Sequence, residues 1–185
     1  MSEIIPAILP KDARELLESL GKLPTAIEYF HMDVLEKDIW APVEKGFEVH
    51  LMVEKPETIL NLWIERGARR IIVHKIGEEI LKYRRQIEIG LGFELSVPTE
   101  EMLAMASFAD FVHIISIAEI GEQGHPLDLR VFDRIKTVQE KFPELLISVD
   151  GGITEENYEK LISAGADRLV VGSHFQEVWN SVQKN

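Results

Sequence analysis

The sequence predicts one (β/α)8 barrel domain over residues 1–185. Strand-like and helix-like segments alternate eight times along the chain, almost without exception. The strand-like segments are rich in Ile, Val and Leu, as parallel strands covered on both faces are. Residues 67–73 (GARRIIV) also read like residues 165–171 (GADRLVV), so the repeating unit is one step from a helix end into a strand. Eight such units favour a closed barrel over an open sheet.

Short apolar runs are the expected strands. The first is interrupted by Pro6, and turn residues or charged residues bound most of the others. In chain order the expected strands are residues 4–9, 26–34, 47–53, 69–74, 89–95, 111–116, 145–149 and 168–171.

Amphipathic segments separate these strands. In the first, Leu16, Leu17 and Leu20 share one side and Gly21 ends the pattern. Another begins at Pro98 with acidic residues in its first turn, where the helix dipole favours them. The expected helices are residues 10–21, 56–66, 77–85, 98–108, 127–142, 155–164 and 173–183.

One helix of the regular pattern is expected to be absent. The interval between the second and third strands carries Pro42 and Gly46 and is too short for two loops and a normal helix. We therefore expect this second helix to be missing or reduced to a turn, and the fourth to be short. Losing a helix uncovers apolar strand surface, which usually marks an interface. We expect a homo-oligomer, such as a dimer, with Trp40, Phe47 or Val49 near the contact.

Composition excludes several functional classes. The formal net charge of −12 argues against non-specific binding to nucleic acid or to an anionic membrane. The chain has no cysteine, which excludes disulfides and thiol chemistry. Its start lacks the features of a signal peptide, and no apolar stretch is long enough to cross a membrane. We expect a cytoplasmic protein.

Histidine and aspartate side chains lie at or near the ends of three predicted strands. His31 and Asp33 are two residues apart, so they share one face of a strand, and His50 and Asp150 occupy similar positions on two others. In a barrel the reactive groups lie at the carboxyl ends of the strands. Each residue alone could be a satisfied core histidine or a turn cap, but together they favour a site for one divalent ion, Zn, Fe or Mn.

Two turns near the end of the chain are candidates for binding phosphate. Each leads from a strand into a helix, where glycine allows close approach to backbone N–H groups and the helix N-terminus favours an anion. Their residues are Gly151, Gly152, Gly172 and Ser173. The alternative is ordinary capping by Thr154 and by Ser173, which forms a capping-box pattern with Gln176.

Three further histidines carry weaker signals. His113 should point into the barrel from the sixth strand, where a hydrogen-bonded packing role is expected. His125 and His174 lie in a loop and at a helix start, where each is either solvated or in contact with a ligand.

Seven segments, in this order and spacing, resemble one known family. They are residues 6–9, 31–34, 50–54, 73–74, 149–153, 165–167 and 171–173. Over nearly its whole length the chain resembles the ribulose-phosphate 3-epimerases. The resemblance implies a barrel of the ribulose-phosphate-binding type that binds a small phosphorylated sugar. It implies that Gly151, Gly152, Gly172 and Ser173 hold the phosphate and that Met52 contacts the substrate.

The resemblance also implies a metal-dependent reaction, the conversion of D-ribulose 5-phosphate to D-xylulose 5-phosphate. His31, Asp33, His50 and Asp150 would bind one divalent metal, and Asp33 and Asp150 would form the acid/base pair. Epimerisation beside a ketone removes a proton from one face of a carbon and returns one to the other, so two proton carriers are needed. The metal would stabilise the enediolate between the two transfers.

Some positions depart from the family pattern. Ala7 stands where the family usually has Ser, and Leu35 and Glu36 replace a Met and an Asp. Glu119 and Glu122 place negative charge in the loop after strand six. These departures leave open a compact epimerase-like barrel that has lost the activity or acts on another phosphorylated ligand. A phosphate-binding decarboxylase or isomerase would instead need a catalytic lysine, for which the candidates are Lys37 and Lys75.

Overall fold

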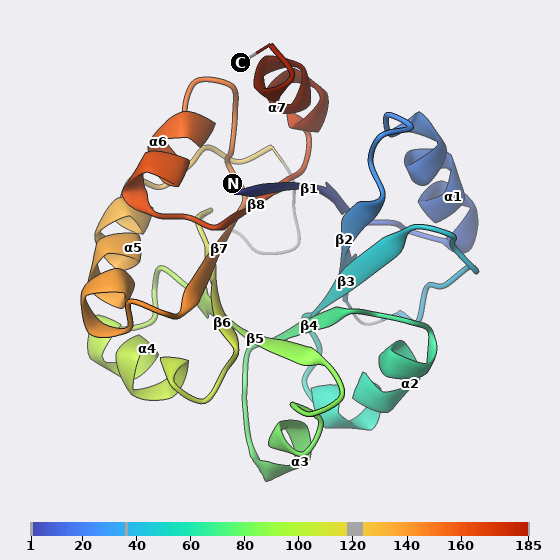
Figure 1. Ribbon diagram of the computed structural model, residues 1–185. Coiled ribbons are helices and arrows are strands. Elements are labelled where there is room, and N and C mark those ends of the chain that lie inside the picture. The colour runs from blue at the N-terminus through green and yellow to red at the C-terminus, as the bar shows by residue number, and fades with distance from the viewer. Residues whose placement is uncertain (1, 36, 118–123, 185) are drawn as a thin grey trace.

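Eight parallel strands close into a barrel surrounded by helices (Figure 1). The computed structural model describes residues 2–35, 37–117 and 124–184. Each strand pairs with the next along the chain, and the last pairs with the first, so the predicted (β/α)8 barrel is confirmed. The strands are β1 (Glu3–Ile8), β2 (Tyr29–Val34), β3 (Gly46–Leu51), β4 (Arg70–Val73), β5 (Glu88–Glu94), β6 (Phe111–Ile115), β7 (Leu146–Asp150) and β8 (Arg168–Val171).

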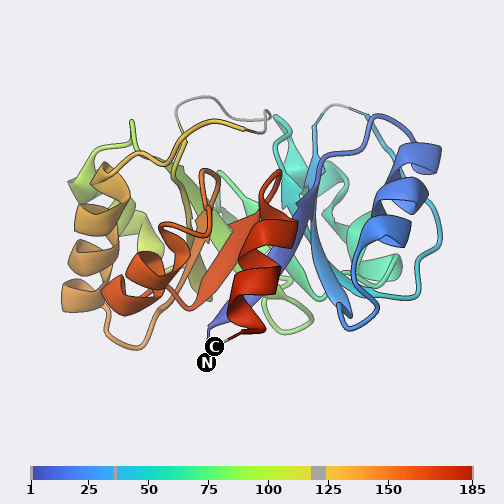
Figure 2. The same ribbon diagram turned by 90° about the horizontal axis from the view of Figure 1, so that it is seen from above.

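The helices lie on the outside of the barrel (Figures 1 and 2). Helix α1 begins after Asp12, whose side chain accepts a hydrogen bond from the backbone N–H of Glu15 at 2.8 Å. Helix α3 is a single turn, as expected for the shortened fourth connection. The helices are α1 (Ala13–Lys22), α2 (Leu60–Glu65) after a 3-10 turn η1 (Pro56–Thr58), α3 (Glu78–Leu81), α4 (Thr99–Ala106), α5 (Arg130–Lys141), α6 (Tyr158–Ala164) and α7 (Phe175–Val182). None of those described is long and apolar enough to span a bilayer.

The segment between β2 and β3 contains no helix among its described residues, as predicted. Trp40 takes the place of the missing helix. Its ring packs against Phe47 at 5.2 Å and against Trp63 at 5.6 Å between centroids. Arg66 packs against both tryptophans, with its guanidinium 5.3 Å from the ring centroid of Trp40 and 4.6 Å from that of Trp63.

This packing corrects one expectation about the outer face. Phe47 is 2% exposed and Val49 is fully buried within the single chain, so neither is available for a contact between subunits. For Phe47 the error arose because Trp40 of the same chain packs against it. Trp40 is only half-buried, so the homo-oligomer with Trp40 near the contact stays a prediction.

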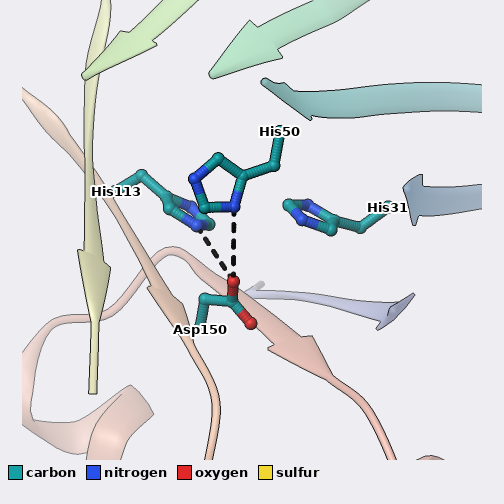
Figure 3. A group of neighbouring side chains, drawn as sticks. All are labelled: His31, His50, His113 and Asp150. Carbon is teal, nitrogen blue, oxygen red and sulfur yellow. Dashed lines mark hydrogen bonds and ion pairs between the residues drawn. The ribbon is translucent and has the colours of Figure 1, made fainter. Parts of the chain in front are cut away.

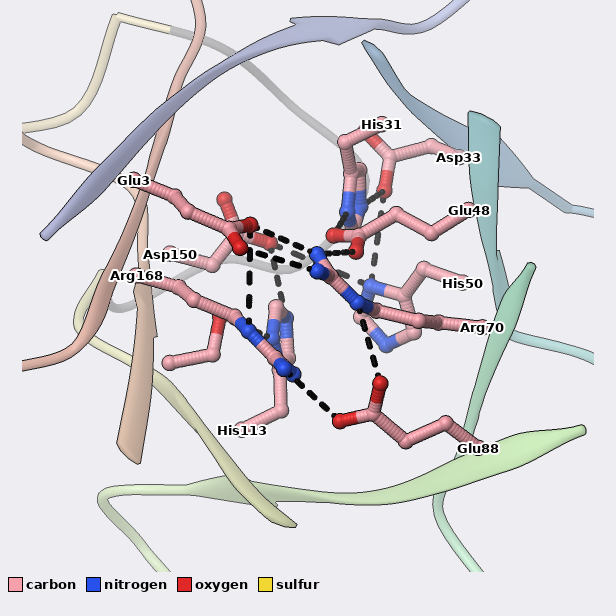
Figure 4. A network of polar contacts seen from close by, with 11 residues as sticks. Glu3, His31, Asp33, Glu48, His50, Arg70, Glu88, His113, Asp150 and Arg168 are labelled. Atoms are coloured by element: carbon pink, nitrogen blue, oxygen red, sulfur yellow. Dashed lines mark hydrogen bonds and ion pairs between the residues drawn. The ribbon is translucent and has the colours of Figure 1, made fainter. Parts of the chain in front are cut away.

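The barrel interior carries a layer of charged side chains at its amino-terminal end (Figure 4). The inward residues follow from strand register, because His31 lies beside Glu48, Glu48 beside Arg70 and Arg70 beside Glu88 on successive strands. Arg70 on β4 also donates to Glu3 on the distant strand β1, so that ion pair crosses the interior. Arg168 on β8 reaches Glu88 on β5 in the same way.

A glycine in this interior supplies a test of the packing. A Cβ on Gly90 would lie 2.3 Å from the ring of Phe111, which is fully buried and has the guanidinium of Arg168 4.7 Å from its ring centroid. We predict that Gly90→Ala lowers the free energy of unfolding by about 1–3 kcal/mol, because the ring has no space to move. Urea unfolding measures this.

The matched control is Gly21→Ala in helix α1, where nothing lies within 4 Å of the added methyl group. This change should be neutral or should stabilise by up to about 1 kcal/mol, since alanine favours a helix interior. Equal effects of the two substitutions would contradict the packing described.

Candidate metal centre and active site

The structure brings the four residues predicted as metal ligands together (Figure 4). Asp33 on β2 lies beside His50 on β3 in the strand register. Oδ1 of Asp33 is 3.3 Å from Nε2 of His31 and 3.4 Å from Nδ1 of His50. Oδ2 of Asp150 approaches the same Nδ1 of His50 at 3.9 Å from β7. The two imidazoles and two carboxylates therefore face one small volume.

A third imidazole, that of His113, lies in this group (Figure 3). Its Nε2 is 3.2 Å from Oδ2 of Asp150, and its Nδ1 is 3.1 Å from Oγ of Ser148. The hydrogen bonds expected from the sequence are present. In addition, one donor atom from each of His31, His50, His113 and Asp150 lies within 4.8 Å of the other three.

Two of the imidazoles have an outer partner that the sequence pattern does not predict. Nδ1 of His31 is 2.8 Å from Oε1 of Glu48, and Nε2 of His50 is 2.8 Å from Nε2 of His74. Glu48 is two residues before His50 on the same strand. Because side chains on a strand alternate between its two faces, this spacing predicts that Glu48 also points into the barrel. Nothing in the local sequence indicates that it meets His31.

Burial and pairing set the charges of this cluster. Burial would raise the pKa of Asp33, but the neighbouring rings of His31 and His50 outweigh it and hold that pKa far below its usual range. Burial disfavours a charged His31, yet hydrogen bonds with Asp33 and Glu48 raise its pKa well above the ordinary value. Burial lowers the pKa of His50, and burial with the nearby His50 lowers that of His74 to about 4.

The residues present fit a divalent metal ion. Nδ1 of His50 is buried without a hydrogen-bond partner and faces the carboxylates of Asp33 and Asp150. An unpartnered buried polar atom is costly, and a cation between the ring and the carboxylates would satisfy all three groups. Imidazole nitrogens with carboxylate oxygens are donors that Zn, Fe and Mn accept.

A cavity opens above these side chains at the carboxyl ends of the strands. It is lined by every residue that the sequence suggested for substrate binding, by both aspartates and by two further histidines: Met52, Gly151, Gly152, Gly172, Ser173, Asp33, Asp150, His125 and His174. Ala7 also lines it, whereas Lys37 and Lys75 do not. The cavity lining therefore does not favour the lysine-dependent alternative.

The turn after β7 requires glycine for two reasons. Gly151 and Gly152 have φ values of +94° and +68°, a backbone region that other residues rarely adopt. A Cβ on Gly152 would also lie 2.4 Å from the backbone N of Leu127. Ser116 fixes the same turn, because its hydroxyl is within 2.9 Å of the carbonyl of Asp150 and 2.7 Å of that of Gly151.

The capping roles considered for these turns are only partly present. Oγ1 of Thr154 accepts a bond from the backbone N–H of Glu156 at 3.3 Å, but helix α6 starts later, at Tyr158. The capping box of Ser173 with Gln176 is not formed, because His174 is the N-cap of helix α7 and the helix begins at Phe175.

Three of the departures from the family pattern cannot be placed. Glu36, Glu119 and Glu122 lie outside the described residues. Leu35 is described and is 40% exposed, so it lies at the surface of the molecule.

The Glu48 carboxylate provides a test of how the centre is supported. It is 1% exposed and contacts both His31 and Arg70, the latter at 3.2 Å. We predict that Glu48→Ala lowers the free energy of unfolding by about 3–5 kcal/mol, because it leaves buried donors without their acceptor. Urea unfolding with a chelator present measures the loss without a metal contribution.

Glu18→Ala is the matched control. Glu18 accepts from Arg14 at 2.7 Å, but the two side chains are 51% and 86% exposed. Its removal should cost no more than about 1 kcal/mol. If both variants unfold at the same urea concentration, Glu48 does not hold the interior together.

Comparisons with known proteins identify the family of this chain. Residues 3–176 match the model of the ribulose-phosphate 3 epimerase family. Ribulose-phosphate 3-epimerase of Aquifex aeolicus is 26% identical, over 94% of this chain and 89% of the relative. The enzyme of that name from Schizosaccharomyces pombe is 23% identical, over 93% and 86%.

A solved structure titled 3-hexulose-6-phosphate synthase superposes with a TM-score of 0.69. It covers 97% of this chain and 99% of its own, and at 14% identity it supports the fold alone. The family match extends over nearly the whole barrel, and the resemblance carried by the sequence segments is confirmed. The chain belongs to the ribulose-phosphate 3-epimerase family.

Proposed function

We propose that this chain interconverts D-ribulose 5-phosphate and D-xylulose 5-phosphate with the help of one divalent metal. One observation carries the proposal: the carboxylates of Asp33 and Asp150, from separate strands, converge on Nδ1 of His50 at the floor of the cavity. His31, Asp33, His50 and Asp150 would hold the metal. Zn, Fe and Mn all suit this set.

The two aspartates would carry the protons. Asp33 is ionised at neutral pH, since its pKa is held far below the usual range, so one of its oxygens can accept a proton. Asp150 on the other strand would deliver a proton to the opposite face of the same carbon, and the roles exchange in the reverse direction. A bound metal would stabilise negative charge on the oxygens of the substrate.

The glycine turns would hold the phosphate. Gly151, Gly152, Gly172 and Ser173 line the cavity on the side where helices α6 and α7 follow, and Met52 lines another part of its wall. Backbone N–H groups at such turns bind anions. Fixing the remote phosphate orients the reacting carbon between the carboxylates.

A cytoplasmic location is part of the proposal. It is supported by the name of a relative from Oryza sativa subsp. japonica, ribulose-phosphate 3-epimerase, cytoplasmic isoform, which is 22% identical over 93% of this chain. The name describes that relative.

The alternative is an epimerase-like barrel that binds the metal or a phosphorylated ligand without this turnover. The observation that favours it is Ala7, which lines the cavity and has no hydroxyl group to offer the substrate. The two functions differ in the outcome of one assay.

The assay measures conversion of D-ribulose 5-phosphate by protein reloaded with Zn, Fe or Mn. We predict turnover in the parent chain and a loss of about 10²–10⁴-fold in Asp33→Asn and in Asp150→Asn, the range for removal of an acid or base. Asp133→Asn changes an exposed carboxylate on helix α5 and should retain full activity. Metal binding without turnover in the parent would favour the alternative.

Metal removal supplies a separate prediction for stability. Zn²⁺ at a free concentration one hundred times its dissociation constant should add about 2.7 kcal/mol to the free energy of unfolding, because it binds only the folded centre. Thermal melts with and without a chelator measure the difference. His50→Ala should abolish the gain and His174→Ala, at the rim of the cavity, should keep it. A gain that survives in His50→Ala would place the metal elsewhere.

A further inference from the structure

The ring of His113 packs against both histidines of the proposed metal site (Figure 3). It is fully buried on β6. Its centroid is 5.6 Å from that of His31, with the rings within 7° of parallel, and 4.9 Å from that of His50, at 69°. Burying a polar ring here is costly unless both of its nitrogens are used.

All three imidazoles share a two-sided arrangement. One nitrogen of each ring faces a partner on the outside of the group, and the other faces the central carboxylates. The outward partners are Glu48 for His31, His74 for His50 and Ser148 for His113. In metal sites the outer nitrogen of a ligating histidine is bonded in this way, which fixes the ring and directs its inner lone pair at the metal.

The hydrogen bond with Ser148 allows the lone pair of Nε2 of His113 to point at a metal. A hydroxyl can donate or accept a hydrogen bond, so Oγ of Ser148 can accept one from a protonated Nδ1 of His113 at 3.1 Å. Nε2 then faces Oδ2 of Asp150, 3.2 Å away, as an unprotonated nitrogen. These two atoms are then both hydrogen-bond acceptors with no proton between them, and a cation bound to both would satisfy them.

We infer that His113 is a ligand of the metal, as a third imidazole beside His31 and His50. The inference rests on the proposed metal site and adds a donor to it. The donor atoms of these rings and of Asp150 all lie within 4.8 Å of one another. Asp33 contacts two of the rings from beside this group.

A third nitrogen changes which metals the site prefers. Imidazole suits Zn, Fe, Ni and Cu, whereas Mg and Mn favour oxygen donors. The chain should therefore bind Zn²⁺ in strong preference to Mn²⁺. His113 would be responsible for part of that preference.

The decisive experiment counts the histidine ligands in the Co²⁺-loaded parent protein by proton NMR. Each imidazole bound to Co²⁺ gives one strongly shifted N–H signal that disappears in D₂O. Three such signals are expected. Two signals would overturn the inference while leaving the proposed metal site intact, and failure to bind Co²⁺ would overturn both.

Replacement of the ring gives a second readout. His113→Leu should lower the affinity for Zn²⁺ at least about tenfold and should lower that for Mn²⁺ less, as measured by competition with a chelating dye. His174→Leu makes the same exchange at the rim of the cavity and should change neither affinity. Equal losses for the two metals would contradict the inference, and the signal count in the parent decides even if the variant does not fold.

Discussion

The centre of this barrel depends on one buried carboxylate, that of Glu48. One of its oxygens lies 2.8 Å from the ring of His31, and the other accepts from Arg70 at 3.2 Å. Burial would raise the pKa of Glu48, but the His31 hydrogen bond and the charge of Arg70 lower it, so it remains ionised. A buried charge is tolerated only with such partners. Glu48 therefore joins the charged layer at the amino-terminal end of the barrel to the candidate metal centre, which it contacts through His31.

The register of neighbouring strands brings the side chains of the candidate site together. Neighbouring strands place Asp33 beside His50 and His113 beside Ser148, so inward side chains that are far apart in the sequence become adjacent pairs. Because the strands are closed into a ring, the side chains from β2, β3, β6 and β7 meet in one volume (Figure 4). The chemistry proposed for the aspartates relies on this closure, which holds both carboxylates against one imidazole.

The sequence predicts most of the fold because the strand and helix patterns are local. The convergence of four side chains could be predicted because His31, Asp33, His50 and Asp150 interrupt apolar strands near their ends. The partners Glu48 and His74 and the place of His113 could not, since they depend on which strands lie side by side and in what register. The expectation of an exposed Phe47 was wrong for a related reason: Trp40 packs against it through a contact that no local pattern specifies.

The packing of Trp40 has a consequence for how unfolding is observed. Two of the three tryptophans, Trp40 and Trp63, lie against each other on the wall of the barrel that lacks a helix, with Arg66 beside both rings. Two of the three intrinsic fluorophores of this kind therefore report on one side of the molecule. Loosening of that side changes the emission while the circular dichroism of the other strands and helices is retained, so divergence of the two signals reports local opening of this wall.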